Sequence, residues 1–419
     1  MSLEAVLLLF SAFATGITLT HSTWVNSIAL PGGLLTITLA GWVAFFTYLG
    51  LEAWSSPKRR LAQYMAIIIV FGGTLINLAG QQVAARRGSQ TTAYRNDGAA
   101  QSVEAAKFLI RGINPYAADF STTPFAIWPS ANGLATRNIA YDHYAYPPLT
   151  FLVFVPPVLL HDLTGWAIDY QLFYFIVWLA MVVIISALAT DWTTRHRLLI
   201  LTLGNPFLWA YAFAGYNDTL FLLGFLAAVL AATRRRWALA GACLGLSLAS
   251  KQTAWLLLPP VAVWLWANYR RGRISFDAAK GFAAATLVTT ALVVLPFLAW
   301  NPAALYDDTV RYVAGVIPDS FPISGTTVIQ YLRVWGFVPS PWSPVAVWPI
   351  QLAVLLPTFW MVARWIRSSP TISRLLAAGS IILLVAVLFN RVGAENYFVS
   401  VLLLAVSSYA ANRSIHGST

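Results

Sequence analysis

The stretch KGFAAATLVTTALVVLPFLA, residues 280–299, contains a single charged residue, Lys280, at its edge. An α-helix rises about 1.5 Å per residue, so a stretch of this length crosses a hydrocarbon core of about 30 Å. Strands of a membrane barrel are about half as long and alternate apolar with polar residues, which this stretch does not do. The stretch therefore predicts a transmembrane helix.

Similar apolar stretches recur along the 419 residues, of which 58% are hydrophobic and 10% are charged. Soluble domains have about 25% charged residues, so this chain has too few charges to cover a water-facing surface. In hydrocarbon the backbone must satisfy its own hydrogen bonds, which helices do. The sequence predicts an all-α, polytopic integral membrane protein with about 12 transmembrane helices in one membrane domain. The predicted spans are residues 3–20, 29–52, 61–83, 169–189, 198–214, 218–233, 237–250, 254–268, 280–299, 345–366, 373–390 and 396–411.

The Lys and Arg residues indicate which side of the membrane each connection faces. Most of the 26 fall in short connections, such as RRR at 234–236 and RRGR at 270–273, that share one side if every span crosses. Positive residues are retained on the cytoplasmic side of a membrane. We expect cytoplasmic N- and C-termini, and we interpret the net charge of +11 as this bias rather than as a nucleic-acid-binding surface. The single cysteine, Cys243, permits no intramolecular disulfide.

Two long segments, residues 84–168 and 300–344, fall on the opposite, extracytoplasmic side. Loops of this length are usually functional or disordered. Both contain aromatic and apolar residues, which favours ordered structure. Residues 147–161 are apolar but short and rich in proline, which breaks helical hydrogen bonding, so we expect a helix on the outer leaflet that does not cross.

Asp97 follows the third predicted span and precedes an amphipathic helix expected near residues 99–112. In that helix the charged side chains of Glu104, Lys107 and Arg111 are expected to face water. A carboxylate at the membrane–water boundary serves as a general base if its pKa suits the task. The alternative is a simple turn, because Asn-Asp-Gly is a common turn sequence.

The stretch YDHYAYPP, residues 141–148, combines Asp142 and His143 with Tyr146 and a proline pair. Tyrosine is common at membrane interfaces in any case. A lone histidine without further His or Cys partners is weak evidence for a metal site. We therefore predict a substrate-positioning role for Asp142, His143 and Tyr146, and no metal.

Lys251, followed by Gln252, lies between two short apolar runs near the outer face. A buried ammonium needs a partner. A phosphate group would supply one, and we expect Lys251 and Gln252 to line a polar cavity that receives it. The alternative is a side chain that extends to the interface along its own apolar stem.

The stretch FNRVGAENYF, residues 389–398, joins the last two predicted spans and brings Arg391, Asn396 and Tyr397 to the same outer face. Two cations on one face, Arg391 and Lys251, suit an anionic phosphate or pyrophosphate group. The alternative for the arginine is an i,i+4 ion pair with a glutamate, worth a few tenths of a kcal/mol when exposed.

Two further features are local. GYNDT, residues 215–219, adds Asn217 and Asp218 to the polar residues of the outer face. Gly241 and Gly245 have the G-x-x-x-G spacing, which we assign to close packing between helices.

Taken in chain order, these stretches resemble the GT-C superfamily of membrane glycosyltransferases, and within it glycosyltransferase family 87, the polyprenyl-phosphate-mannose-dependent α-mannosyltransferases. The resemblance covers about residues 62–411, so residues 1–60 would add two spans before a GT-C-like core of residues 61–411. Its motifs are Asp97, RGINPY at 111–116, YPPL at 146–149, GLSLASKQ at 245–252 and FNRVGAENYF. The acidic pair of some relatives is replaced here by Asn96-Asp97.

The resemblance implies that Asp97 is the general base and that Lys251 and Arg391 hold the phosphate of the lipid carrier. The donor would be a polyprenyl-phosphate sugar in the bilayer, with mannose as the sugar, and the acceptor a glycolipid or a glycan. Transfer would invert the anomeric centre and would need no cofactor and no metal. The site would lie on the extracytoplasmic face of a prokaryotic cell membrane.

The rival hypothesis is a polytopic transporter or a flippase for lipid-linked sugars. Transporters often contain inverted repeats and broken helices at the bilayer midplane. The sequence has no recognisable repeat, and its polar residues gather on one face rather than along a path. This asymmetry favours an enzyme with an outer-face site, and it also disfavours a purely structural membrane subunit.

Overall fold

The computed structural model describes residues 33–52, 56–77, 96–127, 138–166, 169–189, 191–203, 215–317, 320–343 and 347–412, together with the single residues 8, 54, 208, 211 and 345. The chain divides into two compact units. The first comprises residues 1–96, 171–216 and 409–419, and the second comprises residues 97–170 and 217–408.

The first unit is helical throughout its described part. Its elements are α3 (Gly33–Glu52), α4 (Arg59–Ile67), the π-helical turn η1 (Ile68–Gly72), α9 (Tyr170–Leu188, whose first residue belongs to the second unit) and α10 (Trp192–Leu203). The ring of Tyr64 on α4 stacks on His196 and meets Trp192 edge-on, both on α10. Together with a hydrogen bond from Arg60 to the Thr193 hydroxyl, these contacts hold α4 against α10.

The second unit contains the remaining helices and a two-residue strand pair. The long elements are α6 (Asp97–Ile110), α12 (Asp218–Thr233), α13 (Trp237–Leu248), α14 (Leu258–Arg270), α15 (Phe276–Trp300), α18 (Val347–Ser368), α19 (Ile372–Leu388) and α20 (Glu395–Asn412, within this unit up to Ser408). The short elements are η2 (Pro115–Ala117), η3 (Phe120–Thr122), η4 (Pro124–Ile127), η6 (Ile139–Tyr141), α7 (Leu149–Leu152), α8 (Val155–Thr164), η7 (Gln252–Leu257), α16 (Pro302–Tyr306), η8 (Asp307–Tyr312), β1 (Ser324–Gly325), α17 (Val328–Val334) and β2 (Val392–Gly393).

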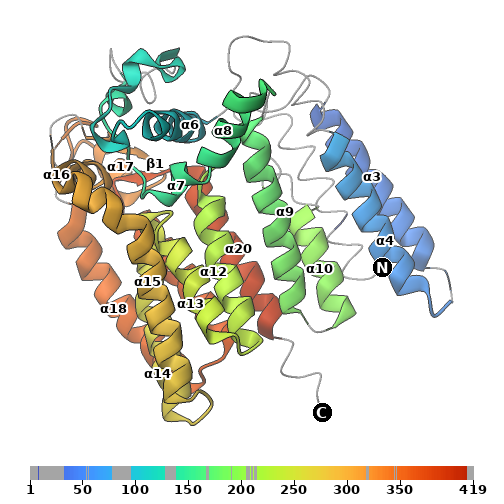
Figure 1. Cartoon of the computed structure of the whole chain (residues 1–419). Coiled ribbons are helices and arrows are strands. Elements are labelled where there is room, and N and C mark those ends of the chain that lie inside the picture. The colour runs from blue at the N-terminus through green and yellow to red at the C-terminus, as the bar shows by residue number, and fades with distance from the viewer. Residues whose placement is uncertain are drawn as a thin grey trace. The chain divides into compact units, whose positions relative to one another are not determined.

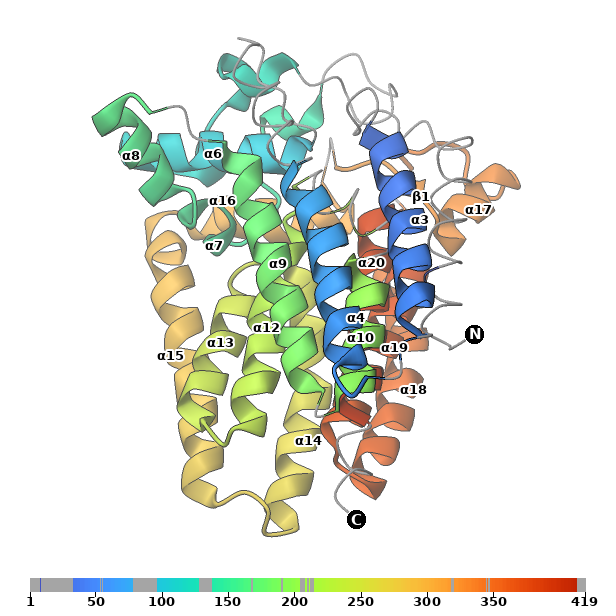
Figure 2. The same ribbon diagram turned by 90° about the vertical axis from the view of Figure 1, so that its right-hand side faces the viewer.

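Within this unit, α6, α7, α16 and α17 gather at one end of the helices α12–α15 and α18 (Figures 1 and 2). The strands β1 and β2 pair in parallel at that end and join the segment after η8 to the connection between α19 and α20. Gly325 has φ +77°, and a Cβ there would lie 2.2 Å from the carbonyl oxygen of Gly393, so only glycine fits this crossing.

The helix α13 packs closely against its two neighbours because small residues line its faces. A Cβ on Gly241 would lie 2.1 Å from the carbonyl oxygen of Phe282 on α15. A Cβ on Gly245 would lie 2.7 Å from that of Thr286. On the other side, the Ser247 hydroxyl donates to a carbonyl of α12. The predicted packing role of Gly241 and Gly245 is confirmed.

The predicted all-α class is confirmed, and the observed helices follow the predicted spans closely. Three described helices are long and apolar enough to cross a membrane: Arg59–Asn77, Phe276–Trp300 and Val347–Ser368. Other apolar helices of the described chain are shorter, including α12, α13 and α19. The number of about 12 crossings stays a prediction, and the predicted span 3–20 lies outside the described residues apart from Leu8.

The proline-rich segment 147–161 forms two short helices, α7 and α8, rather than one. The break at Val153 and Phe154 precedes a proline pair in the first turn of α8, where missing N–H groups cost no helical hydrogen bond. The predicted amphipathic helix is α6, but the expectation that Glu104 faces water is wrong. Glu104 is 6% exposed and accepts a hydrogen bond from Lys107 at 2.8 Å, because α7 and α8 cover this face of α6.

The close contact between α13 and α15 predicts a sensitive glycine. We expect Gly241→Ala to destabilise the protein by about 1–3 kcal/mol, because the added methyl group meets backbone atoms that cannot move independently. The matched control is Gly281→Ala on α15, where nothing lies within 4 Å of the new Cβ. The measurement is the thermal unfolding midpoint of each purified variant in detergent, and equal midpoints would refute the packing argument.

Candidate functional site

Asp97 is the first residue of α6, and its Oδ1 accepts a hydrogen bond from the Gly98 amide at 2.8 Å. Burial raises the pKa of this carboxyl, and the hydrogen bond from Gly98 only partly opposes the effect. A carboxylate with a raised pKa is a better proton acceptor than an ordinary aspartate. The position at a helix N-terminus keeps the negative charge tolerable in a buried place.

Three tyrosines lie within electrostatic range of this carboxylate. Burial raises the pKa of Tyr146 well above its usual value, and the negative charge of Asp97 raises it further. Tyr312, at the end of η8, has a pKa raised in the same way by burial and then by Asp97 and Asp308. Tyr397 on α20 also lies within electrostatic range of Asp97. Both Tyr146 and Tyr312 therefore remain protonated and able to donate hydrogen bonds.

A buried ion pair lies beside these rings. The Lys251 ammonium is 2.6 Å from Oδ1 of Asp218 and 2.9 Å from Oδ1 of Asn217. Oδ2 of Asp218 accepts a hydrogen bond from the Asn396 amide at 2.5 Å. Asp218 is fully buried and Lys251 is 4% exposed. The network joins the N-terminus of α12, the segment after α13 and the first turn of α20.

The faces of two tyrosines complete the surroundings of the ammonium. The Lys251 nitrogen lies 5.7 Å from the ring centroid of Tyr146 and 5.1 Å from that of Tyr397. Cation–π contacts of this kind contribute about 0.5–2 kcal/mol each, more when desolvated. The ammonium thus positions both rings as well as the carboxylate of Asp218.

The backbone around Tyr146 is fixed by contacts to the segment that carries Lys251. Gln252 donates to the carbonyl oxygens of Ala145 at 2.6 Å and Thr309 at 2.8 Å. The Thr150 hydroxyl donates to the carbonyl of Ser250 at 2.6 Å. The predicted residue Gln252 therefore holds the Tyr146 segment and η8 together.

His143 pairs with a carboxylate that the sequence interpretation did not single out. Its Nδ1 lies 2.8 Å from Oδ1 of Asp308, and the Asp308 Oδ2 accepts from the Tyr144 amide at 2.8 Å. The imidazole also stacks on Tyr312, with ring centroids 4.5 Å apart. Burial raises the pKa of Asp308, and its bonds to His143 and Tyr144 oppose this.

Two predicted site residues lie apart from this group. Asp142 is exposed. Arg391 is 2% exposed, and its guanidinium donates to the carbonyl oxygens of Phe321, Pro341 and Ser343 at 2.6–3.3 Å. The arginine therefore ties the segment between η8 and α18 to the connection before α20.

Across the described residues, no three His, Cys, Asp or Glu side chains come together in a way that could hold a metal ion. The site therefore contains the Asp97 carboxylate, the tyrosines within its electrostatic range, the Lys251–Asp218 ion pair and the His143–Asp308 pair.

Residues 144–390, more than half of the chain, match the model of glycosyltransferase family 87. The chain belongs to this family. No curated protein matches it. The predicted resemblance is thereby confirmed at the level of the family.

In this family 87 glycosyltransferase, the matched region contains Tyr146, Lys251 and Gln252 but begins after Asp97 and ends before Arg391. Asp97 and Tyr397 are brought to the matched region by the fold. The sequence interpretation missed Asp308 and Tyr312, although the Asp307-Asp308 pair in a long apolar segment is a local signal that could have identified them.

The buried pair predicts a non-additive pair of substitutions. We expect Lys251→Met to destabilise the protein by about 3–5 kcal/mol, because it leaves the Asp218 carboxylate buried without a counter-charge. Asp218→Asn in the Lys251→Met background should recover much of this loss. The measurement is the thermal midpoint of Lys251→Met, Asp218→Asn and the double variant in detergent.

The matched control is Arg311→Met, which breaks an exposed pair with Asp307 whose two side chains are 43% and 41% exposed. Exposed pairs contribute about 0–1 kcal/mol, so this variant should unfold close to wild type. Additive losses in the double variant would contradict the buried-pair interpretation.

Proposed function

We propose that the protein transfers a hexose from a polyprenyl-phosphate sugar to a glycolipid or glycan acceptor, with Asp97 as the general base. One observation carries this proposal. Two nearby carboxylates are already engaged. Asp218 accepts hydrogen bonds from Lys251 and Asn396, and Asp308 is hydrogen-bonded to His143 and to the Tyr144 amide. Asp97 accepts only from the adjacent Gly98 amide among the described hydrogen bonds, which leaves it available for an acceptor hydroxyl.

The reaction follows from that placement. Asp97 takes the proton of an acceptor hydroxyl while the oxygen attacks the anomeric carbon of the donor sugar. The bond between that carbon and the phosphate oxygen breaks, and polyprenyl phosphate leaves with the bonding electrons. Attack opposite to the leaving group inverts the anomeric centre, so a β-linked donor gives an α-linked product. General-base assistance of this kind contributes about 10²–10⁴-fold to the rate.

The leaving phosphate needs positive charge nearby. An ammonium has three N–H groups, and the hydrogen bonds of Lys251 to Asn217 and Asp218 use two of them. The third supports the proposal that Lys251 faces the phosphate. The hydrogen bonds of Arg391 to three carbonyl groups favour a structural role for that residue instead.

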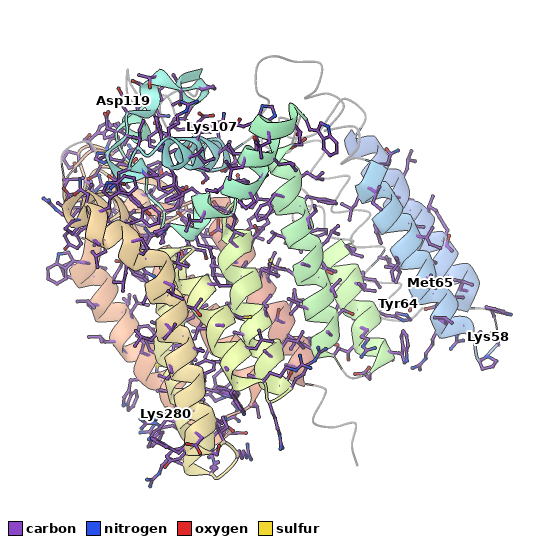
Figure 3. The ribbon with its side chains drawn as sticks, viewed as in Figure 1. Lys58, Tyr64, Met65, Lys107, Asp119 and Lys280 are labelled. Carbon is purple, nitrogen blue, oxygen red and sulfur yellow. The ribbon has the colours of Figure 1, made fainter. Side chains whose placement is uncertain are left out.

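Mannose is proposed as the sugar on the resemblance described above, together with an extracytoplasmic site, cytoplasmic termini and a prokaryotic cell membrane. The distribution of charge in the second unit supports the orientation. Arg234, Arg270 and Arg374 lie in or beside the turns at the end away from Asp97. Figure 3 shows Lys280 at that end, and Lys107 and Asp119 at the other. Under the positive-inside rule, this distribution supports an extracytoplasmic position for the Asp97 end.

The transporter alternative is disfavoured by membership of a glycosyltransferase family. It would regain support if purified protein moved lipid-linked sugars across vesicle membranes without transferring sugar. The same vesicles can report both activities.

The proposed base predicts a loss of activity and a shifted pH profile. Asp97→Asn should lower transfer from radiolabelled polyprenyl-phosphate mannose by about 10²–10⁴-fold, since the amide cannot accept the proton. In wild type the raised pKa of Asp97 keeps it protonated to a higher pH than an ordinary aspartate. Activity should therefore rise with pH through that higher pKa, and fall away on acidification earlier than for an unperturbed carboxylate.

The control variant is Asp162→Asn, an exposed carboxylate on α8, which should retain transfer. Full activity of Asp97→Asn would exclude Asp97 as the base. A rate that stays constant down to the ordinary pKa range of aspartate would contradict the buried carboxylate as the titrating group.

The proposed orientation predicts opposite labelling of two positions. In a Cys243→Ala background, Thr122→Cys should react with a membrane-impermeant maleimide from outside intact cells. Arg234→Cys should react only after the membrane is opened. Both positions are exposed. The reverse pattern would overturn the orientation.

A further inference from the structure

Two buried polar atoms of the second unit, one next to the Lys251 ion pair and one next to the His143–Asp308 pair, have no hydrogen-bond partner in the part of the chain that the structure describes. They are the amide nitrogen Nδ2 of Asn217 and the hydroxyl of Tyr312. Asn217 is 5% exposed and Tyr312 is 2% exposed. Buried polar atoms nearly always have partners, and leaving one without a partner costs about 1–3 kcal/mol.

The amide of Asn217 is held in one orientation. Its carbonyl oxygen accepts from Lys251 at 2.9 Å, so Nδ2 must occupy the other corner of the amide group and point away from the ammonium. It faces the hydroxyl of Tyr146, whose pKa it lowers slightly against the larger raising effect of burial, but its geometry makes no hydrogen bond there. Lys251, which is held by Asp218, therefore orients the Asn217 side chain so that its Nδ2 is on the side of the Tyr146 hydroxyl.

The hydroxyl of Tyr312 is held from the opposite direction. Its ring stacks on His143, which is fixed in turn by Asp308. Gln101 lies about one turn after Asp97 on α6 and donates to the carbonyl of His143 at 2.7 Å, which brings the stacked rings of His143 and Tyr312 to the first turns of α6. On the other side, the Lys251 ammonium joins Asn217 to the Tyr146 ring. Three elements thus contribute uncharged donors to this end of the unit: the N-terminus of α12, the segment before α7 and η8.

The chemistry of these groups fits a sugar better than an anion. Lys251 and Asp218 compensate each other, so the unpartnered groups apart from the third N–H of Lys251 and the Asp97 carboxylate are an amide and hydroxyls. Hydroxyl and amide groups exchange hydrogen bonds with sugar hydroxyls, and tyrosine rings pack against the apolar face of a pyranose. We infer that the Asn217 amide and the Tyr312 hydroxyl bind hydroxyl groups of a hexose held beside Asp97. This inference rests on the proposed transfer reaction and assigns the sugar site within it.

The test compares binding of the same lipid with and without its sugar. Full-length protein in lipid nanodiscs is titrated with polyprenyl-phosphate mannose, with sugar-free polyprenyl phosphate and with methyl α-mannoside. Tyr312→Phe keeps the ring and removes the hydroxyl. Asn217→Ser keeps an uncharged oxygen on the Lys251 side and removes the amide donors without adding a charge. Each variant should weaken binding of a mannose-bearing ligand by about 3- to 10-fold, as expected for one lost hydrogen bond, and leave sugar-free lipid unchanged.

The mannose ligand that is affected identifies the source of the hexose. A loss confined to the lipid-linked sugar indicates the donor, and a loss confined to methyl α-mannoside indicates the acceptor. The control is Tyr306→Phe, an exposed tyrosine 55% accessible on α16, which should change no affinity. Unchanged affinity for both mannose ligands in Tyr312→Phe and Asn217→Ser, or an equal loss for the sugar-free lipid, would overturn the inference.

Failure of the reaction is distinguishable from failure of this site. If transfer depends on Asp97 but neither variant discriminates sugar-bearing from sugar-free ligand, the proposed function stands and the sugar site is wrong. If the variants discriminate but no transfer is detected with any acceptor, the sugar site stands and the reaction is wrong. If wild type binds mannose-bearing lipid no more tightly than sugar-free lipid and does not bind methyl α-mannoside, the inference is overturned.

Discussion

The ion pair between Lys251 and Asp218 is the constraint on which the polar end of the second unit depends. Either charge alone in this apolar bundle would cost several kcal/mol, so the two must meet, and their bonds to Asn217 and Asn396 satisfy them further. Meeting requires the N-terminus of α12, the chain after α13 and the first turn of α20 to converge. Small residues let α13 approach α12 and α15 closely, which brings the chain after α13 next to α12. The pair therefore determines where the apolar bundle ends and the site begins.

The irregular segments above that pair are held by long polar side chains that each bridge separate stretches of backbone. Gln101 donates to the carbonyls of Ala140 and His143, Gln252 to those of two other segments, and Arg391 to three carbonyls. Backbone near a membrane must find partners within the protein, because lipid offers none. Side chains with several donors in a fixed geometry are suited to this task. Arg391, which the sequence suggested as a phosphate ligand, accordingly binds backbone carbonyls.

Hydropathy predicted the helices well because each long apolar stretch carries its own signal. The predicted spans 280–299 and 345–366 are α15 and α18 to within a few residues. The gathering of Tyr146, Lys251, Asn396 and Tyr397 at one end also followed from counting alternating spans. The hydrogen-bond and ion-pair partners of these residues could not be predicted from the sequence, because they depend on tertiary contacts. Nothing local to Lys251 indicates Asp218, and nothing local to Glu104 indicates that α7 and α8 cover it.

The same convergence explains how a site with a compensated lysine still suits a phosphate. The helices α6, α12 and α20 begin at or beside Asp97, Asp218 and Asn396, and the last two of these residues are hydrogen-bonded to each other. Each helix N-terminus carries about half a positive charge on its free N–H groups. Three such termini in one region offset the carboxylates of Asp97 and Asp218 and add to the field of Lys251. In the proposed reaction, a lipid phosphate would meet this field together with the third N–H of Lys251, and the uncharged amide and hydroxyls would contact the sugar.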